Sequence, residues 1–234
     1  FPCQEARCNF TPLLGTITIF FADIQYFSLQ NDCGTILKYI INYMKQRKEA
    51  GTVRVISGMA KGRGLKSVPG MSTRPTTDKV KEAVFSMIGP FFESGIVLDL
   101  FAGTGALGIE ALSRGMERAI FVDLHPKSIE VIRSNLRATG LEDRAEVYRN
   151  DAARAVKALH KRGMRFNLVF LDPPYRMMCA DLAEFLDVNR MLLPESDVVI
   201  EHAADREYPD QIGGMGRRRF AVYGDTAVSI YSCL

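Results

Sequence analysis

The tetrapeptide Asp172-Pro173-Pro174-Tyr175 combines a carboxylate, two rigid backbone carbonyls and an aromatic ring. A carboxylate and carbonyls without competing N–H donors can hold the N–H groups of an exocyclic amine on a nucleic-acid base. The lone pair of that amine, otherwise delocalised into the ring, then turns toward a methyl donor. The aromatic ring offers a face on which a flipped or unpaired base can stack, worth ~1–3 kcal/mol. These four residues are predicted to be catalytic; a plain Pro-Pro turn is the alternative.

A glycine-rich segment at 101–108, Phe-Ala-Gly-Thr-Gly-Ala-Leu-Gly, follows an apolar run. It matches the G-x-G-x-x-G pattern of dinucleotide-binding folds, and Asp123 stands twenty residues after Gly103. Glycines let the backbone approach a cofactor closely, and the acidic residue can accept hydrogen bonds from ribose hydroxyls. An NAD-dependent oxidoreductase is therefore one interpretation of this segment.

Asp99, just before the glycine loop, favours a different cofactor. Its carboxylate would repel the phosphates of a dinucleotide, whereas it would attract the sulfonium and amino group of S-adenosylmethionine. The Asp-Pro-Pro-Tyr motif and an expected C-terminal hairpin agree with this choice. Asp151 could accept a hydrogen bond from the adenine amino group, cap the following helix, or both. The predicted S-adenosylmethionine-binding residues are Asp99, Phe101, Gly103, Thr104, Gly105, Asp123, Leu124, Asp151 and Ala152.

Short apolar runs alternate with helical patterns from residue 96 onward. Strands are expected at 96–100, 119–122, 145–148, 168–171 and 198–201. One of the intervening helices should begin at Pro126 and end before Gly140. Continuous apolar strands separated by helices predict an α/β fold with a mostly parallel sheet covered on both faces. Segments 219–223 and 227–231 flank a Gly-Asp-Thr turn and predict a C-terminal antiparallel hairpin.

A basic stretch precedes this region. Residues 53–58 are expected to form a short strand, and Thr76 or Thr77 to cap a helix that ends near Ile88. Between residues 54 and 79 six basic residues stand against one acidic residue, an excess that suits contacts with phosphates. A solvated loop is the alternative. The predicted substrate-binding residues are Lys61, Arg63, Lys66, Arg74 and Thr76.

The composition sets limits on the class of protein. The 234 residues are 47% hydrophobic and 24% charged, and a net charge of +3 gives no overall basic field. The five cysteines form no C-x-x-C pair and the three histidines have no metal-ligand spacing, so no metal site is expected. The longest N-terminal apolar run, 17–22, ends at Asp23, too short for a membrane span. A cytoplasmic protein without membrane contact is therefore expected.

Three parts are expected along the chain. Residues 1–43 are rich in Phe, Ile, Tyr and Cys and precede a basic run at Met44 that could itself follow a start codon. They are predicted to be an N-terminal extension of unknown role, with a docking segment as the alternative. Residues 44–90 are then a basic substrate-binding segment, and residues 91–234 an S-adenosylmethionine-binding catalytic domain.

Residues 53–234 resemble the RsmD family, the bacterial small-subunit rRNA guanine-N2 methyltransferases. The supporting segments are 54–58 (Arg-Val-Ile-Ser-Gly), 61–63 (Lys-Gly-Arg), 74–76 (Arg-Pro-Thr), 81–85 (Lys-Glu-Ala-Val-Phe), 99–108 and 172–175. The Arg-Pro-Thr and Lys-Glu-Ala-Val-Phe combination is specific to the family. The resemblance implies a seven-stranded class I methyltransferase fold that ends in the antiparallel hairpin. It also implies methylation of guanine 966 of 16S rRNA on assembled or assembling small ribosomal subunits. Residues 1–52 are outside it.

Two further functions compete with rRNA methylation. A DNA adenine-N6 or cytosine-N4 methyltransferase would use the same tetrapeptide, but such enzymes usually carry a recognition domain for which this chain has no room. A non-catalytic rRNA-binding assembly factor would retain the fold, although the intact Asp172 and glycine loop speak against it. A monomer is expected, while the target nucleotide and the assembly state of the substrate are not determined by the sequence.

Overall fold

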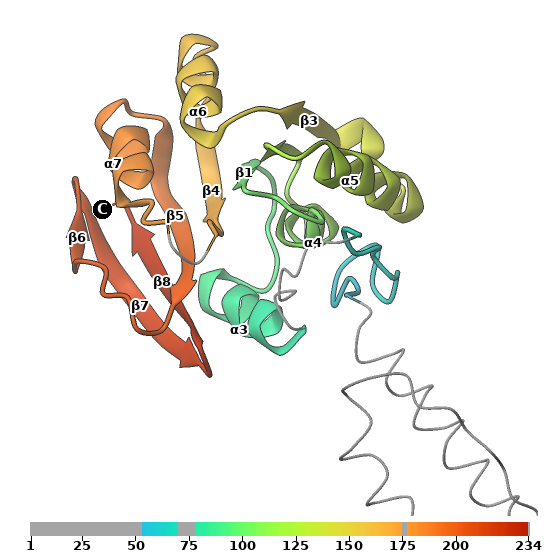
Figure 1. The fold of residues 1–234 in the computed structure, drawn as a ribbon, viewed down its shortest axis with the longest axis horizontal. Coiled ribbons are helices and arrows are strands. Elements are labelled where there is room, and N and C mark those ends of the chain that lie inside the picture. Colours follow the sequence, from blue (N-terminus) through green and yellow to red (C-terminus); the bar gives the residue numbers. More distant parts are fainter. Residues whose placement is uncertain (1–52, 70–77, 175–176, 234) are drawn as a thin grey trace, which may run out of the picture. The chain divides into compact units, whose positions relative to one another are not determined.

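The computed structural model describes residues 53–69, 78–174 and 177–233, all of which belong to the unit Thr52–Leu234 (Figure 1). The expected extension at 1–43 lies outside the described residues. The helices are α3 (Asp78–Ile88), α4 (Ala106–Ser113), α5 (Pro126–Thr139), the 3-10 turn η1 (Glu142–Arg144), α6 (Ala152–Lys161) and α7 (Ala180–Val188). The strands are β1 (Ile96–Leu100), β2 (Arg118–Asp123), β3 (Ala145–Arg149), β4 (Phe166–Leu171), β5 (Leu192–Ala203), β6 (Gln211–Ile212), β7 (Met215–Tyr223) and β8 (Thr226–Ser232).

The strands form one sheet in the order β3-β2-β1-β4-β5-β8-β7-β6. The first five strands of this order are parallel, and β8 runs antiparallel to β5 and to β7. The mostly parallel sheet and the C-terminal hairpin are therefore confirmed. The two-residue strand β6 adds an eighth strand to the seven that were expected.

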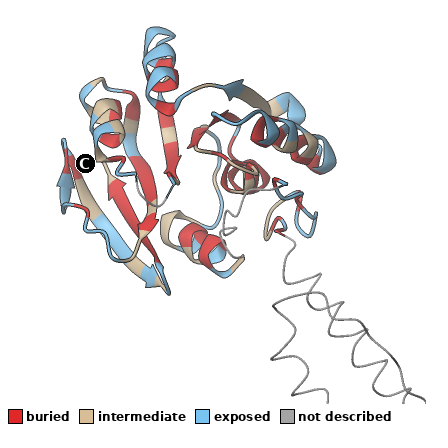
Figure 2. Ribbon diagram, viewed as in Figure 1, coloured by how far each residue is buried: buried red, intermediate tan, exposed pale blue. Residues whose placement is uncertain are grey.

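Helices cover both faces of the sheet, and each face carries its own buried cluster of apolar side chains (Figures 1 and 2). Helices α3, α4 and α5 contribute to one cluster, together with sheet residues such as Val97 and Phe170. Helices α6 and α7 contribute to the other, together with Leu98 and Leu171. Burial on both faces explains why β1, β2 and β4 are mostly apolar in sequence and do not alternate between apolar and polar residues.

The local signals that predicted helix ends are confirmed. Pro126 occupies the first turn of α5, and Gly140 ends that helix in the left-handed conformation with φ 72°. The strand predicted at 198–201 is part of the longer β5. The predicted helix that ends near Ile88 is α3, while the capping threonines, Thr76 and Thr77, lie outside the described residues.

The prediction of a strand at 53–58 was wrong. Only an isolated antiparallel bridge joins Arg54 to Gly64. Gly58 and Gly62 both adopt φ 82°, so the chain turns back within a few residues and pairs with itself. The Val55 N–H donates to the carbonyl of Arg63 at 2.9 Å, which closes this compact loop.

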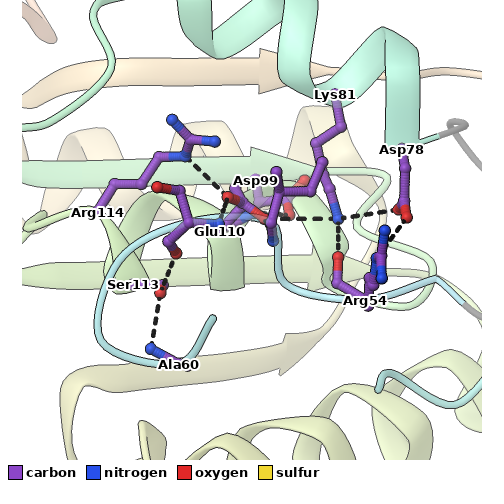
Figure 3. A network of polar contacts seen from close by, with 11 residues as sticks. Arg54, Ala60, Asp78, Lys81, Asp99, Glu110, Ser113 and Arg114 are labelled. Carbon is purple, nitrogen blue, oxygen red and sulfur yellow. Dashed lines mark hydrogen bonds and ion pairs between the residues drawn. The ribbon is translucent and has the colours of Figure 1, made fainter. Parts of the chain in front are cut away.

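A buried ionic network attaches this loop and α3 to α4 (Figure 3). The carboxylate of Glu110 in α4 is fully buried and lies 3.5 Å from the ammonium of Lys81 in α3, which is also fully buried. It accepts hydrogen bonds from the backbone N–H groups of Ile56 at 2.8 Å and Ser57 at 2.9 Å. Arg114 donates to the same carboxylate at 2.8 Å. One charged group thus holds three separate segments together.

The Lys81 ammonium is held by acceptors on both sides. It donates to the carbonyl of Arg54 and lies 3.9 Å from Asp78 (Figure 3). Burial lowers the pKa of Lys81, whereas the charges of Glu110 and Asp78 oppose that effect. Because Lys81 is buried and held by these partners, we assign it a role in stabilising the fold.

We expect Lys81→Met to lower the free energy of unfolding by about 3 kcal/mol. Removing one partner of a buried ion pair costs ~3–5 kcal/mol, and the lower end applies because Arg114 still neutralises Glu110. Urea unfolding followed by circular dichroism measures the change. The exposed pair Arg137–Glu142, 3.5 Å apart, provides the control: Arg137→Ala should cost less than ~1 kcal/mol. Equal losses in the two variants would contradict a special role for the buried pair.

Candidate active site

Three predicted site residues, Asp99, Asp123 and Asp172, lie where the parallel strands end at their carboxyl side. Asp99 in β1 is paired in register with Phe121 of β2 and Phe170 of β4. Asp123 ends β2, and Asp172 directly follows β4. Open α/β sheets bind ligands at this edge, so the fold alone makes it the candidate site.

The glycine loop between β1 and α4 turns through left-handed backbone conformations. Phe101, Gly103 and Gly105 have φ values of 63°, 54° and 76°. Such a value is strained for Phe101, which has a Cβ, and strain of this kind clusters at functional sites. Gly105 is the residue from which α4 begins. Because Gly103 and Gly105 have no side chains, a ligand can approach the backbone of the loop closely at this edge of the sheet.

Gly108, the third glycine of the pattern, is required by close packing. A Cβ there would lie 2.3 Å from the Phe121 ring and 3.0 Å from a carboxylate oxygen of Asp99. The backbone N–H of Gly108 donates to that carboxylate at 2.9 Å. The first turn of α4 is therefore pressed against β1 and β2, and any side chain at this position would push it away.

Asp123 organises the loop with both of its carboxylate oxygens. One oxygen accepts the N–H of Gly103 at 2.8 Å, and the other accepts the N–H of His125 at 2.8 Å. A carboxylate has about four acceptor positions, so two remain for a ligand. The prediction that this carboxylate receives ribose hydroxyls is compatible with its geometry.

Asp99 lies beneath the loop and is almost completely buried, with 2% of its surface exposed. Burial raises the pKa of its carboxyl to about 8; the hydrogen bond from Gly108 opposes this shift and the charge of Asp123 adds to it. A carboxylate that is costly to ionise gains most from a cationic neighbour. The position therefore suits a positively charged ligand and would disfavour a phosphate.

The other predicted cofactor residues have mixed surroundings. Asp151 caps α6, because it accepts the N–H of Arg154 at 3.1 Å, while remaining exposed. Leu124 is 57% exposed and offers an apolar surface beside Asp123. The side chain of Ala152 instead belongs to the buried cluster under α6. The carbonyl of Thr104 accepts the side-chain amide of Asn135 at 2.9 Å, which fixes the loop to α5.

The tetrapeptide predicted to be catalytic is described up to Pro174, and Tyr175 lies outside the described residues. Asp172 is half-buried at the end of β4, Pro173 is buried and Pro174 is exposed. Burial raises the pKa of Asp172 well above its usual range, and the charges of Glu201 and Asp99 add to the effect. The Pro174 carbonyl accepts the N–H of Met177 at 2.8 Å. That carbonyl therefore shapes the turn, whereas no described residue donates to the Pro173 carbonyl.

Glu201 is a further candidate site residue, which the sequence analysis did not single out. It lies in β5 directly after Ile200, which is paired with Leu171 of β4, the residue before Asp172. Only the register of the two strands brings these carboxylates to the same edge. The sequence signal was an acidic residue at the end of an apolar strand, a feature shared with Asp99, Asp123 and Asp172.

The predicted substrate residues belong to the basic loop, by which we mean the basic stretch between residues 54 and 79. Two of them make hydrogen bonds within the protein. Lys61 is exposed. Arg63 donates to the carbonyl of Ala138 at 2.7 Å near the end of α5, and Lys66 donates to Ser134 at 3.0 Å. These two cations thus also bind the loop to α5. Arg74 and Thr76 lie outside the described residues.

Two features are not found in the described part of the chain. No helix there is long and apolar enough to cross a membrane. No group of three or more His, Cys, Asp or Glu side chains in the same residues is arranged to hold a metal ion.

Comparison with protein families gives a match over residues 53–232 to the model described as "Conserved hypothetical protein 95". The chain is 52% identical over 180 residues to the "Putative rRNA methyltransferase YlbH" of Bacillus subtilis (strain 168), covering 76% of this chain and 98% of that protein. It is 32% identical over 183 residues to "Ribosomal RNA small subunit methyltransferase D" of Escherichia coli (strain K12), covering 78% of this chain and 90% of the relative. The chain belongs to the RsmD family.

Solved structures agree with this membership. The "Putative methyltransferase yhhF from Escherichia coli" superimposes with a TM-score of 0.65 at 33% identity, covering 78% of this chain and 98% of that one. The fold of this RsmD-family chain is thus the class I methyltransferase fold, as expected. The family match begins at residue 53, the same residue at which the resemblance found in the sequence begins.

We expect Asp99→Asn to gain thermal stability over the wild type as the pH rises. The pKa of the Asp99 carboxyl is near 3.8 in the unfolded wild type and about 8 in the folded wild type. Between these two values the folded protein holds a proton that the unfolded protein has lost. The free energy of unfolding of the wild type therefore falls as the pH rises through this window. The asparagine stays neutral and can still accept the Gly108 N–H. Melting temperatures of the cofactor-free proteins from about pH 5 to about pH 9 measure the difference.

The exposed Asp143 supplies the control, because Asp143→Asn should differ from the wild type by a similar amount at every pH. A pH-independent difference for Asp99→Asn would show that the buried carboxyl is not protonated in the folded protein.

Proposed function

We propose that this chain transfers a methyl group from S-adenosylmethionine to the exocyclic N2 amine of a guanine in 16S rRNA, during assembly of the small ribosomal subunit. The observation that carries the proposal is Asp172, a half-buried carboxylate with a raised pKa at the end of β4 beside the glycine loop. The family and the names of its relatives support rRNA as the substrate.

The residues present fit S-adenosylmethionine. Asp99 supplies a buried carboxyl group whose charged form a cationic ligand would stabilise, and Asp123 retains acceptor positions for ribose hydroxyls. Gly103 and Gly105 keep the loop backbone open, while Leu124 and Asp151 offer an apolar surface and an exposed carboxylate at the next strand ends. When bound, this cofactor supplies an electrophilic methyl group.

The tetrapeptide would hold the amine for an in-line attack. Asp172 accepts one N–H of the amine and the carbonyl of Pro173 accepts the other, which directs the nitrogen lone pair outward. Alignment of the reacting atoms is the main source of rate enhancement in such a displacement. The nitrogen must then lose a proton, and the raised pKa makes Asp172 the better base to accept it.

The basic loop would position the RNA. Lys61, with Arg63, Lys66, Arg74 and Thr76, forms part of the segment 44–90 that we propose as substrate-binding, and residues 91–234 form the catalytic part. Contacts with phosphates position a nucleic acid without reading its sequence. The target base would then be selected by residues at the carboxyl ends of the strands, and not by the basic loop.

We expect Asp172→Ala to keep its affinity for S-adenosylmethionine and to lose roughly 10²- to 10⁴-fold in kcat, because a positioned proton acceptor is removed. Calorimetry measures the affinity. Mass spectrometry of rRNA nucleosides measures N2-methylguanine in a strain that lacks its own enzyme and expresses the wild type or the variant. Asp181→Ala, which removes an exposed carboxylate from α7, is the control and should restore the modification. Methylation of adenine or cytosine by the wild type would overturn the proposal.

Binding to rRNA should weaken steeply with salt, and Lys61→Ala should reduce the slope of log K against log salt by about 1, as expected for one lost phosphate contact. Lys157→Ala, an exposed lysine of α6, is the matched control and should leave the slope unchanged. Filter binding from low to high salt measures both. A wild-type affinity that does not respond to salt would contradict phosphate contacts by the basic loop.

A further inference from the structure

The three bases with exocyclic amines differ in the ring atom beside that amine. In guanine the N2 amine adjoins N1–H, so two neighbouring groups are hydrogen-bond donors. In adenine the N6 amine adjoins N1, and in cytosine the N4 amine adjoins N3; both of these ring nitrogens are acceptors. A site with two adjacent carboxylates can therefore accept both N–H groups of guanine. In adenine or cytosine, one of these carboxylates would face the lone pair of the ring nitrogen, and the two acceptors would repel each other.

The sheet register places Asp172 and Glu201 next to each other at the substrate edge. Leu171 pairs with Ile200 in the parallel ladder of β4 and β5, so Asp172, the first residue after β4, lies level with Glu201, which is still within β5. Neighbouring strands are ~4.8 Å apart, a spacing at which two side chains can contact one small planar ring.

Both side chains also belong to the same face of the sheet. Side chains alternate along a strand, which places Glu201 on the face of Val199; the same alternation, continued one residue past the end of β4, places Asp172 on the face of Phe170. Val199 and Phe170 are members of one buried cluster, the one beneath α3 and α4. Asp99 lies in register with Phe170 and therefore faces the same way.

Electrostatics agree with this closeness. The charge of Glu201 is the largest contribution after burial to the raised pKa of Asp172. Two like charges at a partly buried edge repel each other, and a ligand with two adjacent N–H donors relieves that repulsion. A ring nitrogen with a lone pair would add to it.

We propose that Glu201 is a specificity-determining residue, which accepts the N1–H of the target guanine while Asp172 accepts an N–H of its N2 amine. The inference rests on the proposed function and deepens it by naming what selects the base. The rRNA phosphates contribute nothing to this choice, since they are common to all nucleotides.

The base 2-aminopurine separates the two contacts. It keeps the 2-amino group of guanine but has an acceptor at N1 in place of N1–H. We would reconstitute small subunits from 16S rRNA in which the modified nucleotide is guanine or 2-aminopurine, and measure methyl transfer by the full-length chain. The wild type should prefer guanine by roughly 10- to 100-fold in kcat/KM, the effect of losing one hydrogen bond to a charged group.

Glu201→Gln should narrow or reverse that preference, because its amide can donate to the N1 of 2-aminopurine. The variant should also shift the acidic limb of the pH profile downward, since Asp172 loses a negative neighbour; a purely structural role would not do this. Calorimetric affinity for S-adenosylmethionine should stay unchanged. Glu207→Gln, an exposed glutamate in the loop after β5, is the matched control and should behave as the wild type.

The outcomes distinguish the inference from the function on which it rests. Equal use of guanine and 2-aminopurine by the wild type, or an unchanged preference in Glu201→Gln, would overturn the role of Glu201 and leave guanine methylation intact. Failure of the wild type to methylate guanine in any small-subunit substrate would overturn the proposed function itself. The wild-type comparison needs no variant, so the test does not depend on Glu201→Gln folding.

Discussion

The packing of the N-terminal loop, α3 and α4 against one another depends on the contacts of a single group, the carboxylate of Glu110. It satisfies two backbone N–H groups of the N-terminal loop, the ammonium of Lys81 and the guanidinium of Arg114 from one buried position. A buried charge is tolerated only when its partners stay in place, because its desolvation is otherwise uncompensated. The loop, α3 and the end of α4 are therefore not independent additions to the sheet; each supplies a partner for the same group.

That constraint continues into the candidate site through α4. The helix that carries Glu110 has Gly105 as its N-cap, and the N–H of Gly108 donates to Asp99. Its other end holds the basic loop, where Ser113 accepts the N–H of Ala60 at 3.0 Å. One helix thus fixes the distance between the cofactor loop and the segment proposed to contact RNA. Rigid placement of both is what an alignment-dependent methyl transfer requires.

The sequence predicted those features whose causes are local. Pro126 and Gly140 mark helix ends by their backbone preferences, and Asp151 does so by the hydrogen bond that its side chain accepts. The glycine loop is recognisable because only glycine fits at Gly108. The parallel sheet as a whole was predicted, but two particular contacts between segments far apart in the sequence were not. The bond between Lys81 and Glu110 joins two helices, and the approach of Glu201 to Asp172 needs the register of β4 against β5.

The antiparallel direction of β8 has a practical consequence. Ser232 at its end pairs with Asp197, four residues before Glu201 along β5. At ~3.3 Å per residue this is about 13 Å along the sheet, toward the edge opposite the strand ends that carry Asp172 and the glycine loop. A tag or surface linker attached after Cys233 would thus leave from the far edge of the sheet. Immobilised protein can keep its proposed RNA-facing edge directed toward solution, where a particle as large as a ribosomal subunit can reach it.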